Sequence, residues 1–226
     1  EEMQAFFHDI DPRLKVLVPI NWPDNGGFRP ASAERVLGAM DIVDFSISSI
    51  NDYLTDIIRE RDQNGKEVWV NCCMWPWEHP NLFTEYPAID ARMFGWIIWA
   101  FDLQGFEYWG VNYYPDGKSE WPTLSNLNPA WLTGKNSNRY GDGYLVYPGR
   151  DANGNPQPIP SIRLANIREG FEDYEYMKTL SDLADELRAT DPGNPLISES
   201  EVLLSIGTPI FDDAEIHCQR FTDNPQ

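Results

Sequence analysis

Apolar and polar positions alternate along the chain in a repeating order of strand, then helix. Nearly continuous apolar runs, typical of parallel strands buried on both faces, occupy residues 14–20, 42–47, 67–74 and 106–113. Helical patterns follow them at residues 32–40, 51–61, 87–103 and 161–190, with Pro87 as a first helical residue and Ser161 as a cap. Four strand–helix units predict an α/β fold with a parallel sheet and right-handed crossovers.

Four such units make half of an eightfold barrel, and a whole barrel needs about 250 residues. We therefore expect residues 1–192 to form the C-terminal half of a TIM-like (β/α)8 barrel. Residues 115–160, dense in Gly, Pro, Asn and Asp, predict a long loop after the last strand. Residues 193–226 then form a helical tail packed on the barrel. The alternative, an open four-stranded sheet, leaves two strand edges unpaired.

The composition favours a globular, acidic protein. Apolar residues make up 42% of the chain, and 36 acidic residues against 17 basic ones give a net charge of −19. This charge repels phosphate backbones and argues against nucleic acid as a partner. It indicates either an ordinary solvated surface or a salty habitat. No apolar run approaches the roughly 18 residues of a membrane span, so no membrane span is expected.

Cysteine and histidine give little support for a metal site or a disulfide framework. The chain has three cysteines, two of them the neighbours Cys72 and Cys73 in an apolar run, and three scattered histidines. Neither type clusters at zinc-ligand spacing, so we expect buried strand thiols, no metal and no cofactor.

Aromatic and amide side chains gather just past the predicted strand ends, where parallel α/β folds place their active sites. Sugar rings bind flat aromatic side chains together with amide or carboxylate partners. The pairs Trp109 with Asn112, and Tyr147 with Asp142, offer this combination. The candidate substrate-binding residues are Trp109, Asn112, Asp142, Tyr147, Trp75 and Tyr113. The alternatives are that the aromatic residues fill the core and that Asp142, between two glycines, only shapes a turn.

Four motifs together resemble the catalytic domain of glycoside hydrolase family 123. They are PAIDARMFGW at 87–96, YWGVNY at 108–113, GDGYLVYPG at 141–149, and PSIRLANIREGFEDYEY at 160–176. Their order and spacing are similar to the C-terminal half of that domain, strongly over residues 67–180 and weakly before them.

The resemblance implies a retaining β-N-acetylgalactosaminidase in which the 2-acetamido group of the substrate attacks the anomeric carbon. An adjacent Asp–Glu pair at the end of the fourth barrel strand orients that group and supplies the acid and base. No such pair precedes the first strand of this chain, and Asp185-Glu186 lies on the outer helix. We therefore assign no catalytic residue here and expect the pair upstream of residue 1, since Glu1-Glu2 resembles the middle of a helix. The parent protein is expected outside the cytoplasm.

Other carboxylates are weaker candidates for catalysis. One group resembles an acid–base cluster: Glu172, Asp173 and Glu175. Arg163 and Arg168 on the same helix favour a simpler interpretation, in which these carboxylates are ion-pair partners. We place Arg163, Glu172 and Asp173 behind the substrate-binding residues, bracing them. Glu78 beside Trp77 is a further weak candidate.

Three functions remain open. The chain is the sugar-binding half of an enzyme on terminal N-acetylhexosamine, a non-catalytic carbohydrate-binding module, or an assembly domain that kept the fold. The expected partners are a glycan and either the N-terminal half of the same enzyme or a second copy of this chain.

Overall fold

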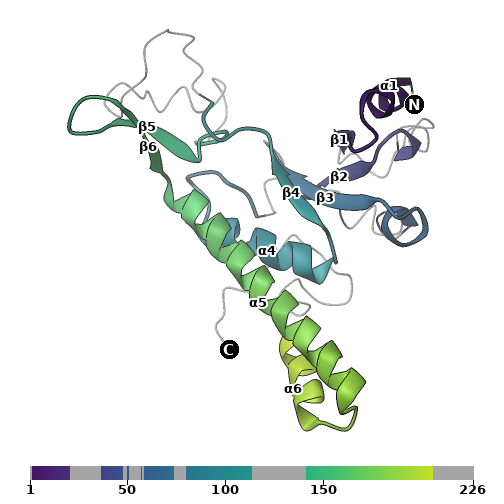
Figure 1. Cartoon of the computed structure of the whole chain (residues 1–226). Coiled ribbons are helices and arrows are strands. Elements are labelled where there is room, and N and C mark those ends of the chain that lie inside the picture. The colour runs from purple at the N-terminus through teal and green to yellow at the C-terminus, as the bar shows by residue number, and fades with distance from the viewer. Residues whose placement is uncertain are drawn as a thin grey trace.

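The computed structural model of the chain describes residues 2–20, 37–47, 50, 57, 59–73, 80–113 and 141–205. Four strands form one parallel sheet in chain order (Figure 1). They are β1 (Leu17–Ile20), β2 (Ile42–Ser46), β3 (Glu67–Cys72) and β4 (Gly105–Tyr108). The four parallel strands and their helices confirm the predicted α/β class, while their continuation into a barrel stays a prediction.

Helices flank this sheet and continue beyond it. They are α1 (Glu2–Ile10), the π-helix η2 (Arg59–Gln63), α4 (Asp90–Ala100), α5 (Ile162–Thr190) and α6 (Pro195–Leu204). Ser161 caps α5 as predicted, with its Oγ accepting from the Leu164 backbone N–H at 3.2 Å. The start predicted at Pro87 is wrong, because its carbonyl accepts from Asp90 in a turn that precedes α4. The helices predicted at 32–40 and 51–61 lie mostly outside the described residues.

One face of the sheet forms the core with α4 and α5. Alternate residues of the strands point to this face, including Phe45, Val70 and Phe106. The Phe106 ring lies 4.3 Å from that of Phe94 on α4 and 6.3 Å from that of Phe171 on α5, centroid to centroid. This packing holds β4 against α4 and α5.

The helices α4 and α5 cross at a pair of glycines. A Cβ built on Gly95 would collide with the backbone of Gly170, so the two helix backbones lie in direct contact. Beside the crossing, the Asp173 carboxylate accepts from Arg92 Nε at 2.6 Å and Nη2 at 2.7 Å, and from Trp96 Nε1 at 2.9 Å. Backbone contact and a two-pronged ion pair together hold α5 against α4.

A β-hairpin replaces part of the predicted loop. The antiparallel strands β5 (Val146–Arg150) and β6 (Pro156–Pro160) pair Tyr147 with Ile159 and Gly149 with Gln157. The prolines stand at every second position, for example where Pro148 faces Pro158. Proline has no backbone N–H, and these positions fall between the pairs that exchange hydrogen bonds. The prediction of a loop over 146–160 was therefore wrong, while 114–140 lies outside the described residues.

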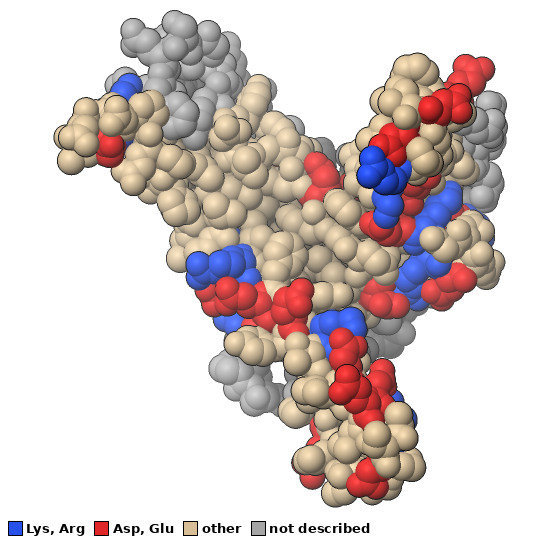
Figure 2. Space-filling model, viewed as in Figure 1, with Lys and Arg blue, Asp and Glu red and all other residues tan. Residues whose placement is uncertain are grey.

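The C-terminal part of the described chain folds onto α5. Helix α6 begins with Pro195 after the Asn194 cap, and its last residues approach α4 through Trp99 Nε1, which donates to the Leu204 carbonyl at 3.2 Å. A helix thus occupies 195–204, and the domain boundary at 192 stays a prediction. Figure 2 shows acidic and basic side chains mixed over α5 and α6, while the middle of that face is largely uncharged. None of the helices described here has the length and apolar character that a membrane span requires.

Candidate functional site at the carboxyl end of β4

The segment after β4 pairs with the segment before β5, and this pairing builds the site. The backbone N–H of Tyr113 donates to the Gly143 carbonyl at 2.9 Å, and those of Leu145 and Val146 donate to Val111 at 2.9 Å. Asn112 and Tyr144 form an isolated antiparallel bridge. Two motifs that lie about 30 residues apart in sequence are thereby brought side by side at the end of the sheet.

Asp142 is the polar centre of this arrangement. Its side chain is 8% exposed, and its Oδ1 accepts from the Tyr108 hydroxyl and from Trp109 Nε1, both at 2.9 Å. Its Oδ2 has no hydrogen-bond partner in the described part of the chain. The Tyr108 hydroxyl in turn accepts from the Gly143 backbone N–H at 2.6 Å. Burial, and then the charge of Asp142, raise the pKa of Tyr108, so its hydroxyl stays a donor.

The two glycines of this segment have a geometric role. Gly141 and Gly143 have φ values of 86° and 74°, in the left-handed region that favours glycine. A Cβ on Gly143 would lie 2.6 Å from the ring of Trp109, so the indole rests on bare backbone. Trp109 remains 40% exposed, and the Tyr113 ring meets it edge-on at 5.0 Å. The result is an exposed aromatic surface anchored on a buried carboxylate.

Arg163, at the start of α5, holds residues 141–144 in place. Its buried guanidinium donates to the carbonyls of Leu82, Gly141 and Tyr144, with Nη1 2.6 Å from Gly141 O. Its Nη2 also donates to the Tyr147 hydroxyl at 3.2 Å. Sequence reasoning paired Arg163 with carboxylates of α5, but it binds backbone carbonyls instead. The half-buried Tyr147 is therefore tied to Arg163 rather than to Asp142.

The acidic side chains of α5 lie elsewhere. Asp173 binds Arg92 at the crossing of α4 and α5, and the hydrogen bonds from Arg92 lower the pKa of its carboxyl group. Glu172 is exposed and lies 3.4 Å from Arg168 one turn earlier. These contacts favour the ion-pair interpretation of both residues. Asn112 is exposed three residues after Trp109, whereas Trp75 and Glu78 lie outside the described residues.

Negative charge gathers around the carboxyl end of β3. Cys72 is fully buried there, and burial, followed by the charges of Asp142, Cys73, Glu107 and Asp44, raises the pKa of its thiol well above the usual value. An inert thiol is the consequence, and a nucleophilic role for Cys72 is disfavoured. Within the described ranges, no three metal-ligating side chains come together as a metal site.

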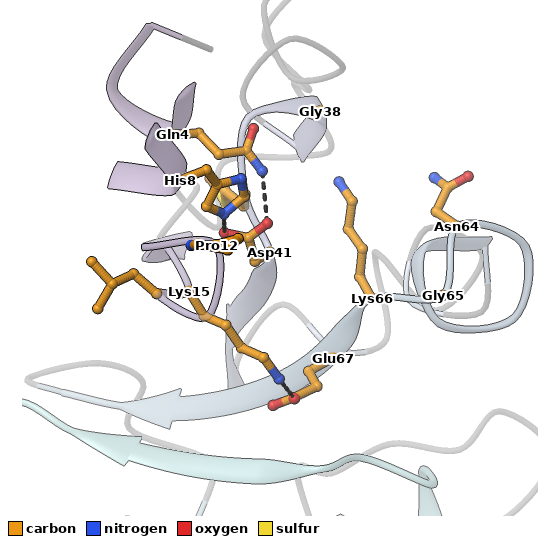
Figure 3. Close-up of a pocket in the computed structure, with 12 residues that line it drawn as sticks. Gln4, His8, Pro12, Lys15, Gly38, Asp41, Asn64, Gly65, Lys66 and Glu67 are labelled. Carbon is orange, nitrogen blue, oxygen red and sulfur yellow. Dashed lines mark hydrogen bonds and ion pairs between the residues drawn. The ribbon is translucent and has the colours of Figure 1, made fainter. Parts of the chain in front are cut away.

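A hollow of about 390 Å³ opens at the amino-terminal edge of the sheet (Figure 3). Its polar groups are paired with one another: Asp41 accepts from Gln4 Nε2 at 2.8 Å and Val16 N at 2.8 Å, and lies 3.0 Å from His8 Nε2. These bonds fasten α1 to the sheet. In parallel α/β folds this edge serves stability, while the opposite edge carries the active site.

Tyr108 is the functional side chain that sequence reasoning missed. It was treated as part of a strand. The available signal was its position directly before Trp109, at a strand end where the candidate residues gather. The structure thus brings together Trp109, Asn112, Tyr113 and Asp142 from the predicted set and adds Tyr108.

Comparisons with known proteins agree with this architecture. No curated protein matches the sequence. A solved structure of a family 123 glycoside hydrolase from Clostridium perfringens, described as acting on glycolipid glycans, is similar with a TM-score of 0.55 and 16% identity. The similarity covers 84% of this chain and 36% of that one, so the chain spans about a third of the length of the neighbour. The family model described as glycoside hydrolase 123, catalytic domain, matches residues 2–180. The chain belongs to the family of glycoside hydrolase 123 catalytic domains.

Proposed function

We propose that this chain is the sugar-binding part of a glycoside hydrolase acting on terminal β-linked N-acetylhexosamine, of the β-N-acetylgalactosaminidase type. In this proposal the reaction retains configuration and is assisted by the acetamido group of the substrate. The Asp–Glu pair belongs to a part of the parent protein upstream of residue 1.

The observation that carries the proposal is the exposed indole of Trp109 fixed on Asp142. An apolar sugar face packs on an aromatic ring, and a neighbouring carboxylate oxygen accepts from hydroxyl groups. Asp142 Oδ1 is occupied by Tyr108 and Trp109, which leaves Oδ2 as the acceptor for a ligand. The Asn112 amide, exposed three residues after Trp109, supplies both donors and an acceptor at the rim.

The local charge also suits glycoside chemistry. Glycosidic bonds break through a transition state with positive charge on the sugar ring. Asp142 and Glu107 both act on the same thiol at the end of β3, so their negative potential overlaps there. Such a potential stabilises a developing cation and disfavours phosphorylated substrates.

The test is binding of N-acetyl-D-galactosamine to the chain, measured by titration calorimetry. Removing the platform with Trp109→Ala should weaken binding by about tenfold or more, because stacking and the anchor of Asp142 are lost together. Tyr176→Ala is the matched control, since Tyr176 is an exposed aromatic residue on α5, away from the site. Equal binding by the Trp109 and Tyr176 variants, or no binding by the unaltered chain, would refute the proposal.

A non-catalytic carbohydrate-binding fragment is the second candidate. Two observations favour it for the chain alone: the chain spans 36% of the similar hydrolase, and Asp185 of the single Asp–Glu pair is bound to Arg188 on the surface of α5. Hydrolysis of p-nitrophenyl N-acetyl-β-D-galactosaminide separates the two. The chain alone should bind the sugar without turnover, and the parent protein should cleave it.

A further inference from the structure

The sheet face turned away from α4 and α5 carries a row of polar side chains. The strand register aligns Ser46 of β2, Asn71 of β3 and Glu107 of β4, near the carboxyl ends of the strands. Asp44 lies two residues before Ser46 and so points to the same face. Because Phe45, Val70 and Phe106 face the helices, this row faces the opposite side of the sheet.

Two members of the row, Asp44 and Asn71, are buried and carry polar atoms that have no hydrogen-bond partner among the described residues. Asp44 is 0% exposed and Asn71 is 2% exposed. Among the described residues, neither carboxyl oxygen of Asp44 nor the Nδ2 of Asn71 has a partner at hydrogen-bond distance and angle, although the Asn71 amide lies near enough to Asp44 to favour its ionised form. Buried polar groups in native proteins nearly always have a partner, since leaving one unpaired costs about 1–3 kcal/mol. Glu107 is only partly buried, and it marks the accessible end of the row.

An aromatic ring adjoins this row. Trp69 pairs in register with Asp44 on one side and Gly105 on the other. A Cβ on Gly105 would lie 2.5 Å from the Trp69 indole, so the ring packs directly against the glycine. The indole is partly exposed. Carboxyl, amide and flat aromatic groups therefore share one face of three neighbouring strands.

The groups that lack hydrogen-bond partners indicate which kind of ligand would pair with them. Carboxylate oxygens accept hydrogen bonds, and the Asn71 amide nitrogen donates them. Vicinal hydroxyl groups supply donors and acceptors together, and the carbon face of the same ring packs on an indole. A phosphate would be repelled by Asp44 and Glu107.

We propose that Asp44, Asn71, Glu107 and Trp69 form a second carbohydrate subsite, which binds the hydroxyl groups of a sugar directly or through one water. The inference rests on the proposed function, which it extends to a second set of residues. Glu107 and Trp69 form the open end, and Asp44 forms the closed end. The subsite adjoins the first, because Glu107 lies on β4 and Trp109, two residues later, directly follows the end of that strand.

Titration of Asp44 gives the subsite a distinctive signature. Burial, opposed by the Asn71 amide and reinforced by the charge of Glu107, raises the pKa of Asp44 to about 7. Burial likewise raises the pKa of Glu107. In the described part of the chain, Glu107 on β4 and the thiol of Cys72 on β3 are the titratable groups that interact with Asp44. Sugar hydroxyls donate to the ionised form, so binding should tighten as pH rises through 7.

The experiment measures binding of N-acetyl-D-galactosamine by calorimetry at pH 6 and pH 8. Asp44 is about one-tenth ionised at pH 6 and nine-tenths ionised at pH 8, so the unaltered chain should bind up to about tenfold more tightly at pH 8. Asp44→Asn should abolish this difference. Glu107→Gln should weaken binding about tenfold at pH 8, because a charged hydrogen bond is lost.

Asp90→Asn is the matched control. Asp90 is also buried, and burial also raises its pKa to about 7, but it lies on α4 behind the opposite face of the sheet. This variant should bind like the unaltered chain and keep the pH dependence. Thermal unfolding establishes that Asp44→Asn is folded, and the partly exposed Glu107 provides an independent variant.

The outcomes separate the two proposals. Normal binding and normal pH dependence in Asp44→Asn and Glu107→Gln, with weak binding by Trp109→Ala, would overturn the second subsite alone. The same conclusion follows if Asp90→Asn removes the pH dependence. Lack of sugar binding by the unaltered chain overturns the proposed function and the subsite with it.

Discussion

Replacing Arg163 with methionine removes all five guanidinium N–H donors while keeping an unbranched side chain of similar length. Three buried carbonyls, those of Leu82, Gly141 and Tyr144, then lose a donor. Each carbonyl left without a donor costs about 1–3 kcal/mol. Part of this loss is offset, because the folded state no longer has to bury the guanidinium charge. We expect the free energy of unfolding to fall by about 3–5 kcal/mol, the range for breaking a buried charged contact.

Urea unfolding followed by tryptophan fluorescence measures this loss. Arg168→Met is the control, because Arg168 lies on the same helix but is exposed, with surface pairs to Glu169 and Glu172 worth about 0–1 kcal/mol. Arg163→Lys should recover only part of the stability, since an ammonium group cannot span the same carbonyls. Equal unfolding midpoints for the Arg163→Met and Arg168→Met variants would refute the view that Arg163 holds the Asp142 loop in place.

Two further predictions concern the helix crossing and pH. Gly170→Ala should lower the free energy of unfolding by about 1–3 kcal/mol, because its Cβ would collide with the Arg92 backbone. Thermal melts measure this loss. Gly193→Ala is the control and should change the melting temperature little, because open space surrounds Gly193. Burial raises the pKa of Asp90 from 3.8 to about 7, so the folded chain keeps a proton there that the unfolded chain releases. Stability should therefore fall as pH rises from about 4 to 7, and Asp90→Asn should raise it at pH 8 by up to about 4 kcal/mol. An unchanged unfolding free energy at pH 8 would contradict the second prediction, and equal melting shifts for both glycine variants would contradict the first.

The strands and the long helix α5 could be predicted because their patterns are local. Continuous apolar runs identify buried parallel strands, and Ser161 before an apolar helical pattern identifies the start of α5. The hairpin β5–β6 was missed because Pro148, Pro156, Pro158 and Pro160 were taken as breakers. Their two-residue spacing was the available signal, since it leaves every second N–H free to pair.

The site was only partly predictable, because its contacts join distant parts of the sequence. The aromatic residues at strand ends indicated Trp109 and Asp142, but not the hydrogen bond between them. The partners of Arg163 are backbone carbonyls, which carry no mark in the sequence. Asp44 did leave a signal, a carboxylate in the middle of an apolar strand. Only the fold shows that its carboxyl oxygens have no hydrogen-bond partner among the described residues.

The length of α5 has a consequence for how the chain opens. Its 29 residues extend about 44 Å, far beyond the 11-residue helix α4, and its C-terminal half packs against α6 away from the sheet (Figure 1). Between Phe171 and Thr190 only Ala184 is fully buried. Backbone amides of α5 near Ile167 should therefore exchange with solvent only when the whole domain unfolds. Those beyond Leu180 should exchange through separate openings of lower free energy that leave the candidate site intact.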